Sequence, residues 1–159
     1  METFARLAVR LADTYKDYET KIESNNGIDY FIIVNPFWEE NIRAFDQDGI
    51  IFQFSYQHAH FDHCEDVDEN IDDLIEYINN FIDKKHVALD FSQGKTSLFG
   101  GSRKREELDT SSGVALLKSF FGNNGTLFEL FYKRMKGTEC RCSVHGWNNA
   151  LNEEIVFVP

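Results

Sequence analysis

The sequence predicts an α+β fold in which two or three helices pack mainly on one face of a largely antiparallel sheet. Two segments, residues 3–22 and 66–83, place apolar side chains at intervals of three and four, as helices with one buried face do. Several short apolar or alternating segments lie between turn residues and are typical of strands joined by hairpins. The chain has 159 residues, is 42% hydrophobic and has only two prolines. We therefore expect a single globular domain over residues 1–159.

Three segments are predicted to be helical. The first, residues 3–22, should end at Asn25-Asn26-Gly27, because asparagine and glycine accept the left-handed conformation that follows a helix. The second, residues 66–83, should bury a stripe that includes Leu74 and Ile78. A third, short helix should run to residue 121, with Asp109, Ser111 or Ser112 as its N-cap.

The remaining apolar segments are predicted to be strands. The Asp-Gly pair within residues 46–49 indicates a hairpin between its two flanking segments. Near the C-terminus, Cys140, Cys142 and Val144 should alternate inward and leave His145 on the outer face. The expected strands, by residue number, are 30–34, 41–45, 50–60, 87–91, 97–99, 126–135, 139–145 and 154–158.

One short motif has metal-binding character. Residues 58–63 read HAHFDH, with His58, His60, Asp62 and His63 as the candidate ligands. The pattern resembles the metal-binding motif of the metallo-β-lactamase superfamily. That resemblance implies a hydrolase in which one or two divalent transition-metal ions, such as zinc, activate a water molecule. If residues 50–60 form one strand, its period of two places both His58 and His60 on the face that carries Phe52, Phe54 and Tyr56.

The rest of the chain departs from that superfamily. Only His86 and His145 follow the motif, and no aspartate follows Asp109, so a dinuclear centre lacks ligands. Cys64 and Glu65 stand where the superfamily carries glycines. No Gly-x-Ser-x-Gly nucleophile motif occurs, and no catalytic residue is assigned. The sequence therefore favours a protein without catalytic activity or cofactor, and a metal-dependent hydrolase with one ion at the HAHFDH segment is the alternative.

Charge indicates the kind of partner. The chain has 27 acidic and 16 basic residues, for a formal charge of −11, which opposes binding to nucleic acid or to anionic lipid and favours a basic protein. The polar face of the helix predicted at 66–83 is the expected contact surface, although a solvated outer face would carry similar charge. Its acidic residues are Asp68, Asp72, Asp73 and Glu76.

Location and protein class follow from the same composition. The sequence has no apolar run long enough to span a membrane, and its start lacks the pattern of a signal peptide, so we expect a cytosolic protein. Its three cysteines are expected to be reduced. A small, acidic α+β chain rich in aromatic residues resembles, in type, the immunity proteins that bacteria make against their own toxins. That resemblance implies binding to a basic toxin.

Overall fold

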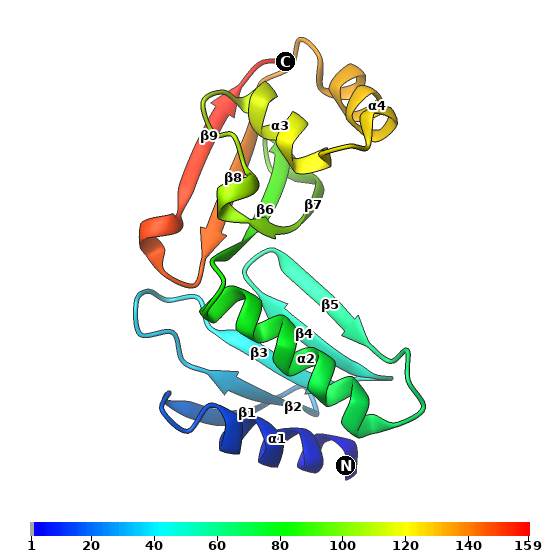
Figure 1. The fold of residues 1–159 in the computed structure, drawn as a ribbon, viewed down its shortest axis with the longest axis vertical. Coiled ribbons are helices and arrows are strands. Elements are labelled where there is room, and N and C mark those ends of the chain that lie inside the picture. The colour runs from blue at the N-terminus through cyan, green and yellow to red at the C-terminus, as the bar shows by residue number, and fades with distance from the viewer. Residues whose placement is uncertain (1) are drawn as a thin grey trace. The chain divides into compact units, whose positions relative to one another are not determined.

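The computed structural model describes residues 2–159, which form two compact units, one ending at Asp83 and the other spanning Lys84–Pro159 (Figure 1). We call them unit 1 and unit 2. The predicted α+β class and the antiparallel pairing are confirmed, with four helices among the described residues. The strands form two sheets, of five and four strands, rather than the one sheet expected. Folding of residues 1–159 as one cooperative domain stays a prediction.

Unit 1 is a five-stranded antiparallel sheet with two helices on one of its faces. Its strands follow one another in chain order, so each hairpin joins two neighbours. The helices contact each other and pack on the sheet, where Phe81 stacks on Phe52 at 5.3 Å between ring centroids. The elements are α1 (Glu2–Thr14), β1 (Thr20–Asn25), β2 (Ile28–Ile33), β3 (Ile42–Asp46), β4 (Ile50–Phe54), β5 (Gln57–Phe61) and α2 (Val67–Ile82).

The first helix is shorter than the sequence predicts, and the end expected for it is wrong. Residues beyond Thr14 turn away, and Ile22 lies in strand β1 with 57% of its surface exposed. Asn26 and Gly27, with φ of 52° and 80°, form the turn between β1 and β2. A two-residue hairpin turn of type I′ needs positive φ at both positions, so the same residue pair that can end a helix here reverses a strand.

The strand expected over residues 50–60 is two strands joined by a tight turn. Ser55, with φ of 50°, begins the reversal from β4 to β5. Phe52 then pairs with Ala59, which puts both residues on the helix-covered face. His58 and His60 consequently point to the opposite face, since neighbouring strand residues alternate. The expectation that the two histidines share a face with Phe52 and Phe54 is therefore wrong.

Unit 2 packs two helices against a four-stranded antiparallel sheet of order β7-β6-β8-β9. The core includes Cys140, Cys142 and Val144, which alternate inward as predicted, while His145 is only half-buried. Ser112, one of the three candidates that the sequence offered, caps the short helix and accepts a hydrogen bond from the Ala115 amide. The elements are β6 (His86–Gln93), β7 (Thr96–Lys104), the 3-10 turn η1 (Arg105–Glu107), α3 (Gly113–Phe121), α4 (Gly125–Met135), β8 (Cys140–Gly146), the 3-10 turn η2 (Asn149–Leu151) and β9 (Glu153–Phe157).

The strand predicted over residues 126–135 is helix α4, so that prediction is wrong. The Asn124 side chain caps α4 by accepting a hydrogen bond from the Leu127 amide. Phe131 then reaches the core, where the centroid of its ring lies 4.2 Å from that of Phe99. Aromatic side chains favour strands in general, but packing in the folded chain outweighs that preference.

Among residues 2–159, no helix has both the length and the apolar character needed to cross a bilayer.

Candidate functional site

The HAHFDH segment does not bring its four candidate ligands together. His58 and His60 lie in β5 on the sheet face without helices. His63 follows the strand and turns toward α2, where its Nε2 lies 2.8 Å from Oδ2 of Asp73. Asp62 lies beside the β3–β4 turn, with its Cβ close to Gly49. The ligands expected from the resemblance are thus divided between the two faces of the sheet.

The two histidines of β5 border a hollow on the helix-free face of the sheet. Their Nε2 atoms are 2.7 Å apart, so one imidazole donates a hydrogen bond to the other. Phe45 and Ile51, which are 9% and 7% exposed, form its apolar floor. The hollow has a volume of about 480 Å³ and is lined by Phe45, Gln47, Asp48, Ile51, Gln53, His58 and His60.

A second hollow continues along the same face toward β1. It has a volume of about 460 Å³, and Gln53 lines both hollows. Tyr30 lies in the second hollow and packs on Phe45 of the first, with ring centroids 4.8 Å apart. The face opposite α1 and α2 therefore offers an extended, partly aromatic surface, which we call the open sheet face.

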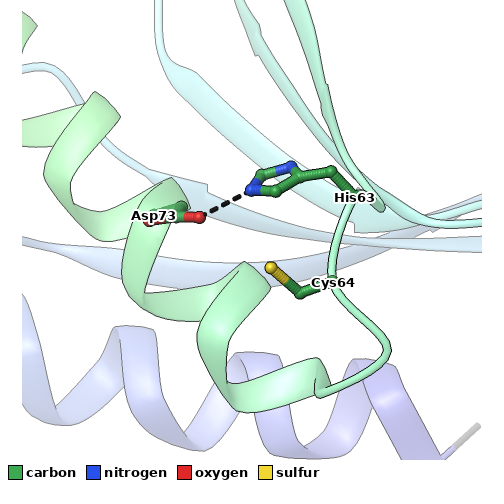
Figure 2. A group of neighbouring side chains, drawn as sticks. All are labelled: His63, Cys64 and Asp73. Atoms are coloured by element: carbon green, nitrogen blue, oxygen red, sulfur yellow. Dashed lines mark hydrogen bonds and ion pairs between the residues drawn. The ribbon is translucent and has the colours of Figure 1, made fainter.

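A different group of ligand atoms gathers on the helix side. One ligand atom each from His63, Cys64 and Asp73 lies within 4.8 Å of the other two (Figure 2). His63 and Cys64 come from the turn after β5, and Asp73 from the second turn of α2. This is a mixed set of imidazole, thiol and carboxylate. We call it the turn cluster.

The backbone of the turn is held by one buried side chain. The Asn70 carboxamide accepts a hydrogen bond from the Cys64 amide at 3.1 Å and donates one to the Cys64 carbonyl at 2.8 Å. Asn70 is only 6% exposed. Asp66 caps α2 by accepting a hydrogen bond from the Asp68 amide. These three hydrogen bonds fix the turn to the first turns of α2.

Negative charge surrounds the Cys64 thiol. Partial burial raises the pKa of Cys64, a hydrogen bond to the Glu69 carboxylate raises it further, and the charges of Glu69, Asp73 and Asp66 act in the same direction. Each of these effects disfavours a thiolate next to carboxylates. In the free protein Cys64 is therefore held as a thiol, which argues against its use as an activated nucleophile.

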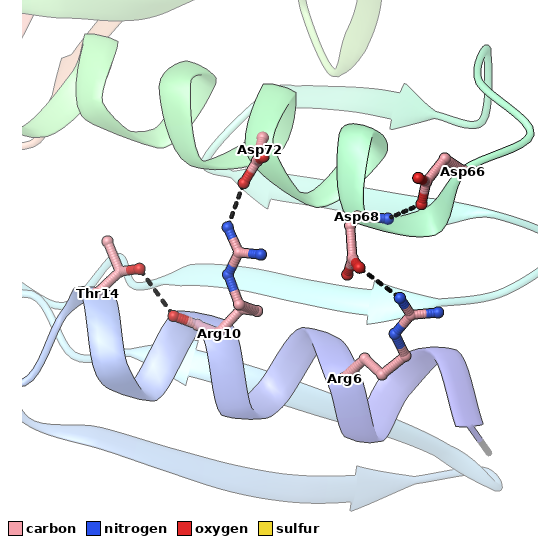
Figure 3. Close-up of polar contacts among 6 residues, drawn as sticks. All are labelled: Arg6, Arg10, Thr14, Asp66, Asp68 and Asp72. Carbon is pink, nitrogen blue, oxygen red and sulfur yellow. Dashed lines mark hydrogen bonds and ion pairs between the residues drawn. The ribbon is translucent and has the colours of Figure 1, made fainter.

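The acidic face of α2 is largely engaged inside unit 1. Arg6 and Arg10 of α1 form ion pairs with Asp68 and Asp72 (Figure 3). Asp73 bonds to His63 as described above. Of the four acidic residues expected to meet a partner, three thus already have a partner within unit 1. Exposed pairs like these contribute little stability, but they reduce the charge that an outside protein would meet.

The negative charge of the chain lies in unit 1. That unit has 19 acidic and 5 basic residues and a formal charge of −14, whereas unit 2 has 8 acidic and 11 basic residues and a charge of +3. Basic side chains of unit 2 surround a hollow of about 540 Å³. They are Lys84, Lys85, Lys104 and Arg105. The net negative charge of the chain therefore comes from unit 1.

The HAHFDH pattern did not predict the turn cluster, because it groups His63 with His58 and His60 rather than with Cys64 and Asp73. A usable signal was present: Glu69 and Asp73 are four residues apart at the start of α2, and helical side chains tilt toward the N-terminus. Carboxylates at these positions therefore reach back to the turn that carries His63 and Cys64.

Comparison with protein-family models, with curated proteins and with solved structures finds no match to this chain.

Proposed function

We propose that this protein is a non-catalytic, cytosolic binding protein that recognises a basic protein through the open sheet face of unit 1. The observation that carries the proposal is the hollow of about 480 Å³ on that face, in a unit with a formal charge of −14. Negative charge of this size attracts a basic partner and raises its association rate. A basic toxin is the class of partner that fits best, and the protein would then act as its immunity protein.

The chemistry of the hollow suits an arginine or lysine side chain. Phe45 and Ile51 offer apolar surface to the aliphatic stem, while the Asp48 carboxylate at the rim can pair with the cationic head. The neighbouring ring of Tyr30 adds a face for cation–π contact. Such aromatic-floored pockets are typical positions for the residues that contribute most to binding.

The open sheet face replaces the α2 face as the favoured contact surface. Asp68 and Asp72 of α2 are paired with arginines of α1 and Asp73 is hydrogen-bonded to His63. By contrast, no described helix of unit 1 covers the hollows around Gln53. Absence of catalysis is favoured because His58 and His60 lie on one face and His63 on the other, so the hydrolase ligand set does not converge. A cytosolic location is supported by the lack of disulfides among the three cysteines.

A defined pair of peptides tests the surface. We expect a peptide of alternating glycine and arginine to shift the amide NMR signals of Phe45, Ile51 and Gln53, and the glycine–glutamate counterpart to leave them unchanged. Gln53→Lys should lower the affinity for the arginine peptide about fivefold, which corresponds to roughly 1 kcal/mol of binding free energy for one added like charge. Asn80→Lys, which makes the same charge change on α2, is the matched control and should leave the affinity unchanged.

Two results would contradict the proposal. Signals that shift only along α2, or equal weakening by both lysine variants, would mean that net charge and not the open sheet face directs binding. Hydrolysis of a small substrate that is lost in His60→Ala would replace the binding function by the metal-dependent hydrolase.

A further inference from the structure

The turn cluster has a chemistry that the proposed binding function does not use. An imidazole, a thiol and a carboxylate lie at the surface of unit 1, with ligand atoms within 4.8 Å of one another (Figure 2). The His63 Nε2 and Asp73 Oδ2 atoms are already 2.8 Å apart. We propose that His63, Cys64 and Asp73 form a mononuclear site for a thiolate-binding divalent metal ion, of which zinc is the best fit.

The distances are close to those of a tetrahedral site. Zinc binds nitrogen and oxygen ligands at about 2.0–2.2 Å and sulfur at about 2.3 Å, so the ligand atoms around it are separated by roughly 3.2–3.8 Å. From the 4.8 Å limit of the cluster, the widest separation needs to contract by about 1–1.6 Å, and the 2.8 Å between His63 Nε2 and Asp73 Oδ2 needs to lengthen by about 0.4 Å. His63 and Asp73 are exposed and Cys64 is half-buried, so their side chains can rotate to make this change.

A fourth ligand is at hand on the same helix. The Glu69 carboxylate is hydrogen-bonded to the Cys64 thiol and lies one helical turn before Asp73. It can coordinate the ion directly or orient a water molecule at the fourth position. When the ion binds, it takes the place of the thiol proton and of the hydrogen bond between His63 and Asp73, and the thiol proton is released to solvent.

The ligand types select among metals. A thiolate is a poor ligand for calcium or magnesium, which prefer oxygen, and a good one for zinc and for cobalt as its spectroscopic substitute. One imidazole and one or two carboxylates complete a set that zinc accepts. The acidic residues Glu65 and Asp66 near the cluster add attraction for a cation.

The protein holds this site before an ion arrives. Asn70 bonds both the amide and the carbonyl of Cys64, so the backbone that carries the thiol is fixed relative to α2. Asp73 lies on the second turn of the same helix. Little backbone entropy is then lost at Cys64 on binding, which favours affinity, although the exposed side chains of His63 and Asp73 still lose rotational freedom. The bound ion would tie the β5–α2 turn to α2 and stabilise unit 1 by an amount that grows with the logarithm of the free ion concentration above its Kd.

Cobalt titration of untagged protein tests the site. We expect one Co²⁺ per chain, with a thiolate-to-cobalt charge-transfer band and the visible bands of a tetrahedral ion, and displacement of both by Zn²⁺. Cys64→Ser should abolish the charge-transfer band, and His63→Ala and Asp73→Asn should each weaken Co²⁺ binding by about tenfold or more. The matched control is the double variant His58→Ala/His60→Ala, which should bind Co²⁺ as the original protein does.

A second readout guards against misfolded variants. Without metal, Cys64→Ser should have the same circular dichroism and melting temperature as the original protein, and Zn²⁺ should raise the melting temperature of the original protein and of the His58→Ala/His60→Ala variant but not that of Cys64→Ser. The proposal is overturned if no charge-transfer band forms, if Cys64→Ser binds Zn²⁺ as tightly as the original protein, or if binding is lost in the His58/His60 variant instead.

Discussion

Asn70 provides a direct test of how the β5–α2 turn is held. Its buried carboxamide makes two hydrogen bonds to the backbone of Cys64, at 3.1 and 2.8 Å. Each such bond contributes about 1 kcal/mol net, and Asn70→Ala also leaves the amide and carbonyl of Cys64 without these partners. The lost contacts should therefore lower the free energy of unfolding by about 2–3 kcal/mol. The higher helix propensity of alanine offsets roughly 0.6 kcal/mol of this loss.

Asn80→Ala is the matched control, because it makes the same replacement in the same helix at a position that is only half-buried. The propensity gain then cancels between the two variants, and the difference between them reports the hydrogen bonds. We expect Asn70→Ala to be less stable than Asn80→Ala by about 2–3 kcal/mol.

Urea unfolding of unit 1 can be followed through Trp38, in a Trp147→Phe background that removes the tryptophan of unit 2. A difference under about 0.5 kcal/mol between the two alanine variants would refute the reasoning, since it would mean that water replaces the Asn70 carboxamide at no cost. Asn70→Ala should also weaken Co²⁺ binding at the turn cluster, because the Cys64 backbone would no longer be fixed.

Further predictions concern the core, cooperativity and pH. Leu74→Ala, at a fully buried position of α2, should lower the free energy of unfolding in urea by about 2–5 kcal/mol. Leu130→Ala, at a position 60% exposed, should lower it by under about 0.5 kcal/mol. Similar losses in the two variants would mean that the buried face is wrongly assigned. If residues 1–159 unfold as one domain, Trp38 and Trp147 fluorescence should change at the same urea concentration, and separate midpoints would show independent units. Desolvation and then Lys104 lower the pKa of His86 below its usual 6.5, so the unfolded state takes up a proton more readily. The free energy of unfolding should therefore fall as the pH drops below 6.5. His86→Gln should reduce that fall, and a pH profile that His86→Gln leaves unchanged would contradict the role of His86.

Local patterns determined much of the secondary structure. The stripe of α2, the Asp-Gly hairpin before β4 and the alternation of Cys140 and Cys142 in β8 were all predicted from residue spacing and are confirmed. The cap of α3 is Ser112, one of the three residues that the sequence offered. Each depends on near neighbours in the chain, through a helical period, a cap, a turn or a two-residue alternation. The α+β class could be inferred because these signals agree with one another.

Where a local pattern fitted two structures, the sequence left the choice to packing. Residues 126–135 are aromatic enough for a strand, yet their contacts with Phe99 and Phe121 are made from a helix. Asn26-Gly27 suits a helix end and a hairpin equally, and pairing of β1 with β2 decides between them. Such choices depend on contacts between residues far apart in the chain, which propensity does not contain.

The candidate site depended on tertiary structure most of all. The sequence placed four candidate ligands within six residues, namely His58, His60, Asp62 and His63. The turn at Ser55 and the exit from β5 nevertheless send His58 and His60 to one face of the sheet and His63 to the other. His63 instead joins Cys64 and Asp73, because α2 folds back over the turn. Composition alone determined the acidity of the chain. The boundary at Asp83, which assigns most of the acidic residues to one unit, and their pairing with Arg6 and Arg10 followed only from how the chain folds.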